Sequence, residues 1–177
     1  MGRLKSPVTS RDHIQGSDNA IVTLVEYGDY QCPYCGAAQP IVKQIQARFA
    51  GKLRLVFRHF PLVEVHPLAQ PSAETAEFAG SQGRFWPMHD AIYANQHQLS
   101  ITRLVTLAAN LHLSPIALRD ALALGTYAGK VQADFIGGVR SGVNGTPTFF
   151  INGVRHDSPL GVMDLAAAID QTILTDA

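Results

Sequence analysis

Cysteine, charge of one sign and long apolar runs are all scarce in this chain. Two cysteines among 177 residues are too few for a disulfide framework. Basic and acidic side chains balance to a formal net charge of zero, which argues against nucleic acid as a partner. The longest apolar stretches are far shorter than a bilayer requires, so we expect no membrane span in this chain.

The first twenty residues lack the apolar central stretch of a secretory signal. We therefore expect a cytoplasmic protein, the alternative being a periplasmic or exported mature form whose signal has been removed. This polar segment is interrupted by Pro7 and Gly16, so residues 1–19 are expected to be a flexible lead-in. The remaining residues, 20–177, have the composition of a globular domain.

The order of strand-like and helix-like segments indicates an α/β fold. Residues 21–27 and 53–57 are apolar and β-branched, which predicts two buried strands. The segment between them carries an apolar residue at every fourth position and predicts a helix, on the positions Ala37, Ile41, Ile45 and Phe49. Residues 148–151 predict a third strand, and Asn152-Gly153 then predicts a tight hairpin.

A helical block separates the second and third of these strands, over about residues 67–141. Its composition shifts to Ala, Leu, Gln and Glu, and strand-like runs disappear. Five short helices are expected, over residues 69–82, 85–97, 101–111, 115–124 and 127–140. Ser114-Pro115 is typical of a helix N-cap followed by a first-turn proline. A last amphipathic helix over residues 162–174 completes the chain.

The two cysteines, Cys32 and Cys35, lie between the first strand and the helix that follows it, in the sequence CPYC. A disulfide stabilises a fold mainly by closing a long loop, and this pair would close a very short one. The first turn of a helix offers free N–H groups and partial positive charge, which favour a thiolate on Cys32. Cys35 follows one turn later, within reach of a mixed disulfide on Cys32. Pro33 lacks an N–H group and suits an early helical position.

A zinc site is the alternative for these cysteines. Four ligands would be needed, and no second cysteine pair exists, although His59 and His66 could complete the set in principle. The location between strand and helix favours redox chemistry over metal binding. We therefore expect neither a metal ion nor a cofactor.

The cysteine motif, Pro40 eight residues after Cys32, and the segment GTPTFF at 145–150 together resemble the thioredoxin superfamily. The helical block resembles its DsbA-like branch. VEYGDYQCPYC, FRHFPL, GRFWPMHDAIYANQ and GTPTFFING are similar to bacterial DsbA-like thioredoxin domains, some of which are fused to sodium/proton antiporters. The resemblance implies a thioredoxin fold with a helical insertion between the second and third core strands.

The resemblance also implies roles for individual residues. Cys32 matches the nucleophile and Cys35 the buried resolving cysteine. Pro147 matches a proline that is cis in the family and lies against the sulfurs, and Thr146 would present backbone groups to an extended substrate. Glu26 matches a buried acid whose pKa burial should raise, allowing proton exchange with Cys35.

The dipeptide between the cysteines, Pro33-Tyr34, affects the redox potential strongly in this family. DsbA-like oxidases usually carry His at the second position, so Tyr34 argues against a very oxidising potential. The span runs from about −270 mV for thioredoxin to about −120 mV for DsbA, and we expect an intermediate value.

These observations predict a thiol–disulfide oxidoreductase that exchanges disulfides with proteins or small thiols, glutathione among them, and that depends on a redox recycling partner. The direction of the reaction stays open. The alternative is a redox-sensing or peptide-binding module that uses the same groove without turnover.

Overall fold

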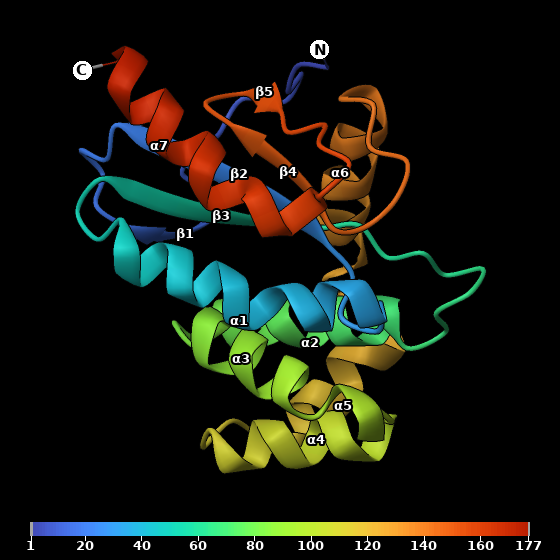
Figure 1. Ribbon diagram of the computed structural model, residues 1–177. Coiled ribbons are helices and arrows are strands. Elements are labelled where there is room, and N and C mark those ends of the chain that lie inside the picture. The colour runs from blue at the N-terminus through green and yellow to red at the C-terminus, as the bar shows by residue number, and fades with distance from the viewer. Residues whose placement is uncertain (1, 177) are drawn as a thin grey trace. The chain divides into compact units, whose positions relative to one another are not determined.

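The computed structural model describes residues 2–176 and contains one five-stranded sheet in the order β1-β3-β2-β4-β5 (Figure 1). Strands β1 and β3 pair antiparallel, as do β2 with β4 and β4 with β5. The strands are β1 (His13–Gly16), β2 (Val22–Gly28), β3 (Leu53–His59), β4 (Thr148–Ile151) and β5 (Val154–Arg155). Strands β2, β3 and β4 are almost entirely buried, as their near-continuous apolar sequences predict.

Two helices lie side by side on one face of this sheet, α1 (Pro33–Arg48) and α7 (Leu165–Asp176) (Figure 1). Arg48 at the end of α1 forms an ion pair of 2.5 Å with Asp170 on α7. Helix α7 buries Leu165 and Ile169 completely. A short 3₁₀ turn, η2 (Gly161–Asp164), precedes α7, so the expected last helix begins as a tighter turn.

The buried side of α1 differs from the expected one. Its buried apolar residues are Cys35, Ala38, Val42 and Ile45, and buried Phe49 follows directly after the helix, whereas Ala37 is exposed and Ile41 only half-buried. These spacings of three and four residues follow the helical repeat more closely than a strict interval of four. Cys35 therefore belongs to the same apolar stripe as the core residues of this helix.

The described residues divide into two compact units, one holding the sheet and the other comprising residues 29–36 and 59–135. The second unit is helical, and its helices bury Ala76, Met88, Ile92, Leu104 and Leu118. Its elements are α2 (Ala69–Gly80), α3 (Phe85–Ala94), η1 (Gln96–Gln98), α4 (Ile101–Asn110), α5 (Pro115–Leu124) and the first turns of α6 (Ala128–Arg140).

Capping residues set several of these boundaries. The Ser114 side chain accepts the N–H of Ala117, Pro115 occupies the first turn of α5, and left-handed Gly125 ends that helix. The expected helix over residues 85–97 instead ends at Ala94, because Asn95 has a non-helical backbone, and η1 follows as a separate turn.

The segment expected to be a flexible lead-in is built into the sheet. Strand β1 pairs with β3, Ile14 lying opposite Val56, and Arg3 bridges to Val154. The physical reason is a buried cation on β3, the guanidinium of Arg58, whose donors need acceptors. These acceptors come from the lead-in, as the carboxylate of Asp12 and the backbone carbonyls of Ser6 and Pro7.

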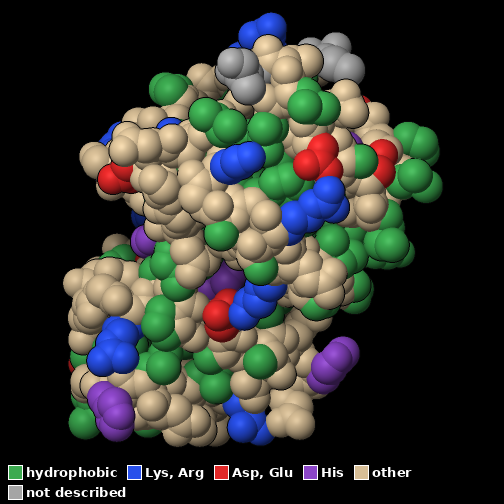
Figure 2. Space-filling view, turned by 60° about the vertical axis from the view of Figure 1, so that its left-hand side comes forward, with side chains coloured by type: hydrophobic (Ala, Val, Ile, Leu, Met, Phe, Trp, Pro, Cys, Tyr) green, Lys and Arg blue, Asp and Glu red, His purple; other side chains and the backbone are tan. Residues whose placement is uncertain are grey.

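No helix within residues 2–176 is both long enough and apolar enough to cross a membrane. On the face shown in Figure 2, basic and acidic side chains are interspersed with apolar ones.

The Arg58–Asp12 ion pair yields a stability prediction. The two side chains are 4% and 6% exposed, and Nε of Arg58 lies 2.8 Å from Oδ1 of Asp12. Asp12→Ala would leave a buried, unpaired cation, so urea unfolding should show a loss of roughly 3–5 kcal/mol. The matched control, Asp170→Ala, breaks an exposed pair and should cost below about 1 kcal/mol. Equal losses for the two variants would contradict a structural role for Asp12.

Candidate active site

The turn that carries the cysteines begins at Asp29, directly after β2, and leads into α1. Cys32 is the residue before the first helical position, and its carbonyl accepts the N–H of Gly36 at 3.1 Å. Cys32 is 4% exposed and Cys35 is fully buried, so Cys32 is the more accessible residue of the pair.

The position of Cys32 at the start of α1 has an electrostatic consequence. The first N–H groups of a helix lack partners within the helix and carry partial positive charge. A thiolate at this position is stabilised relative to one in water. Cys35 has a different environment, since its sulfur accepts the backbone N–H of Asp29 at 3.5 Å.

A buried carboxylate, that of Asp29, organises this turn. One oxygen accepts the backbone N–H groups of Gln31 at 2.7 Å and Cys32 at 3.1 Å. The other accepts the N–H of Leu62 at 2.9 Å and lies 2.8 Å from Nδ1 of His66. The carboxylate thus joins the cysteine turn to the loop that follows β3.

Neither Asp29 nor His66 was assigned a role from the sequence. The spacing D-x-x-C, in which an aspartate accepts amides two and three residues onward, is the signal that could have identified Asp29. The sequence offers His66 only as a possible zinc ligand. The two histidines that a zinc site would need both contact carboxylates, His66 that of Asp29 and His59 that of Glu77 at 2.7 Å.

The side chains between the cysteines face outward. Pro33 is exposed, and the Tyr34 side chain is 75% exposed. They are accessible to a partner molecule.

Glu26 lies on β2 and is completely buried. Tyr27 and Glu26 are neighbours on β2, so their side chains point to opposite faces of the sheet. The Tyr27 hydroxyl lies near Gly137 of α6, which places Glu26 on the other face, the one that α1 and α7 cover. Neither carboxyl oxygen has a hydrogen-bond partner among residues 2–176. Burial raises the pKa of this carboxyl to about 8, so it is largely protonated at neutral pH.

The Thr146–Pro147 peptide bond is cis, as the resemblance implied. It leads into β4, where Phe149 pairs with Glu26 and Thr148 with Tyr27. Pro147 is therefore level with the end of β2, after which the chain enters the cysteine turn.

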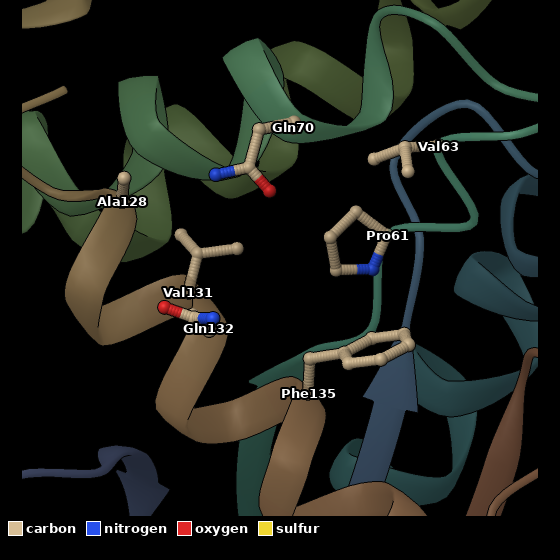
Figure 3. Close-up of a pocket in the computed structure, with 7 residues that line it drawn as sticks. All are labelled: Pro61, Val63, Gln70, Ala128, Val131, Gln132 and Phe135. Carbon is tan, nitrogen blue, oxygen red and sulfur yellow. The ribbon is translucent and has the colours of Figure 1, made fainter.

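A pocket of about 270 Å³ lies in the helical unit beside the loop after β3 (Figure 3). Pro61 and Val63 line it, and they flank Leu62, whose N–H is held by Asp29. The opposite wall is formed by α6 residues, and the amides of Gln70 and Gln132 border the cavity (Figure 3). Its lining is Pro61, Val63, Gln70, Ala128, Val131, Gln132 and Phe135.

The family model described as "Thioredoxin" matches residues 8–171 of this chain. The chain belongs to the thioredoxin family. Two curated relatives are the Na(+)/H(+) antiporter NhaA 1 of Salinispora arenicola, 46% identical over 159 residues, and the antiporter NhaA of Herminiimonas arsenicoxydans, 38% identical over 153. They align with 90% and 86% of this chain, which spans 24% of the length of each.

Solved structures show that this thioredoxin fold is of the DsbA type. Oxidised BdbD from Bacillus subtilis superposes with a TM-score of 0.85, at 24% identity over 99% of this chain and 97% of that one. Wolbachia pipientis alpha-DsbA1 superposes with a TM-score of 0.82, at 20% identity over 96% and 94%. The expected α/β fold, with a helical insertion between the second and third core strands, is confirmed. The chain thus has a DsbA-type thioredoxin fold, and its sequence is similar to part of each antiporter polypeptide.

Glu26 yields a pH prediction. Its pKa is about 8 in the fold against an ordinary 4.5, so between these values the native state holds a proton that the unfolded chain has released. The free energy of unfolding should therefore fall as pH rises through this window, by up to about 1.4 kcal/mol per pH unit. Glu26→Gln removes this contribution and should gain stability over wild type from about pH 5 to about pH 8.

Urea unfolding across this pH range measures the effect. Glu64→Gln is the matched control, because Glu64 is exposed and its loss should leave the pH dependence parallel to that of wild type. If the Glu26→Gln curve also runs parallel to wild type, the buried carboxyl does not titrate as described.

Proposed function

We propose that this domain is a thiol–disulfide oxidoreductase in which Cys32 is the nucleophile and Cys35 the resolving thiol. The observation that carries the proposal is the placement of two cysteines at the start of α1, one at the helix terminus and one buried a turn later. Membership of the thioredoxin family and the DsbA-type fold support it.

The reaction proceeds in two exchanges. The Cys32 thiolate attacks one sulfur of a substrate disulfide, the S–S bond breaks, and one substrate sulfur leaves as a thiolate that takes up a proton. The Cys35 thiolate then attacks the Cys32 sulfur of the mixed disulfide, which releases the second substrate thiol and leaves a Cys32–Cys35 disulfide. Two electrons pass to the substrate, and the reverse sequence oxidises a substrate dithiol.

Cys35 must lose a proton before it attacks. In this proposal the ionised fraction of Glu26, a minority at neutral pH, accepts that proton, as the resemblance implies. Burial supports the role, because a carboxyl with a pKa near 8 exchanges protons readily at neutral pH. Glu26 also lies only three residues before Asp29, whose N–H contacts the Cys35 sulfur.

Protein substrates are supported by the pocket beside the loop after β3. Its apolar residues, Val63 and Val131 among them, suit a side chain near a substrate cysteine, and its glutamine amides suit peptide backbone groups (Figure 3). A recycling partner must then restore the starting redox state of the pair.

Reduction of insulin by dithiothreitol tests the proposal. Wild type should accelerate it, Cys32→Ser should abolish the acceleration, and Cys35→Ser should accumulate a mixed disulfide with insulin, visible by mass spectrometry. Glu26→Gln should slow the second exchange more than the first. A parallel assay on oxidised glutathione should give a lower kcat/KM than insulin.

Several outcomes would contradict this. Full activity of Cys32→Ser would show that Cys32 is not the nucleophile. Equal slowing of both exchanges by Glu26→Gln would show that Glu26 is not the proton acceptor. A wild-type pair that cycles between dithiol and disulfide but gives no turnover would favour a redox-sensing or peptide-binding module instead.

A further inference from the structure

A glutamine of the helical insertion forms hydrogen bonds to the backbone at the beginning of the cysteine turn. Gln96 begins the 3₁₀ turn η1, and its side-chain nitrogen donates to the carbonyl of Tyr30 at 2.9 Å and to that of Cys32 at 2.8 Å. Both hydrogens of the amide are used, one on each carbonyl. One side chain thus fixes the backbone on both sides of Gln31.

The two acceptors determine which way the amide points. Both neighbours are carbonyl oxygens, so only the nitrogen end of the Gln96 amide can face them. The Cys32 carbonyl also accepts the N–H of Gly36, which places it in the first turn of α1. Gln96 therefore acts on the residue where the nucleophile and the helix terminus meet.

Gly36 provides the space that the amide occupies. A methyl group added there would overlap the Oε1 atom of Gln96 and lie 2.9 Å from its Cδ and 3.1 Å from its Nε2. Gly36 is in a helix and has no positive φ, so the backbone itself does not require glycine. The requirement comes from the packing of Gln96.

We propose that Gln96 is a positioning residue for Cys32, with Gly36 as the space that admits it. By holding the two carbonyls, Gln96 keeps the Cys32 sulfur at the N-terminus of α1, where a thiolate is stabilised. Its loss lets the turn adopt conformations in which the sulfur leaves the helix terminus. The consequence for disulfide exchange rests on the proposed function, whereas the effect on the thiol itself does not.

The test measures the reaction of Cys32 with iodoacetamide in a Cys35→Ser background, where Cys32 is the only thiol. At pH 7, Gln96→Met should react roughly three- to tenfold more slowly, the range that one or two hydrogen bonds contribute. The deficit should shrink toward about pH 9.5, where thiols ionise regardless of position. Loss of structure would instead alter the rate at every pH.

Gly36→Ala supplies a second route to the same result. Alanine normally strengthens a helix relative to glycine, but here its methyl group should displace the Gln96 amide and slow alkylation to a similar extent. Once Gln96→Ala has removed the amide, adding Gly36→Ala should cost little more. The double variant should therefore match Gln96→Ala alone, a coupling that independent sites do not show.

Two controls accompany these variants. Gln98→Met alters an exposed glutamine of the same turn whose side chain accepts a hydrogen bond from Arg103, and it should react like wild type. Gly129→Ala adds a methyl group to a helical glycine with open space and should also react like wild type.

Three results would each overturn the proposal. Gln96→Met could react like wild type at pH 7, its rate deficit could be independent of pH, or the rate factors of the two single substitutions could multiply in the double variant. Alkylation needs only a reactive thiol, so these results can be told apart from a failure of the insulin assay, which would count against the oxidoreductase function alone.

Discussion

The Asp29 carboxylate is the constraint on which the cysteine turn depends. It is buried, and a buried carboxylate is costly unless every lone pair finds a donor. Backbone N–H groups of the turn and of the loop after β3 supply those donors, together with His66. These donors reach the carboxylate only when the turn and the loop fold around it. The resulting conformation of the turn places Cys32 directly before the first residue of α1. One buried charge thus links the helical insertion to the cysteine pair.

The two sulfurs acquire different characters from this arrangement. Cys32 lies at a helix terminus with partial positive charge, whereas Cys35 lies on the buried stripe of α1, one turn from the surface. In the proposed reaction this difference in access and electrostatics makes the two cysteines act in a fixed order, Cys32 first. The exposed Tyr34 side chain carries no positive charge, so it adds nothing to the stabilisation of a thiolate at the helix terminus.

Much of this could be predicted from the sequence because it depends on local patterns. The strands around Leu24 and Phe150 follow from continuous apolar runs, and α5 follows from Ser114-Pro115 and Gly125. Contacts between distant segments could not be predicted in this way. The pairing of Arg58 with Asp12 drew the lead-in into the sheet, and Gln96 reaches Cys32 across 64 positions. Both depend on a single polar side chain whose partner has no periodic signature.

The reduction potential of the Cys32–Cys35 pair tests the central claim most directly, that the geometry of this turn makes a reversible redox couple. Equilibration of the purified domain with glutathione buffers, followed by thiol trapping, measures it. A helix terminus combined with the uncharged Pro33-Tyr34 dipeptide predicts a value between about −270 mV and about −120 mV, near the middle of that span. A pair that stays fully reduced or fully oxidised across the whole range of buffers would contradict the account.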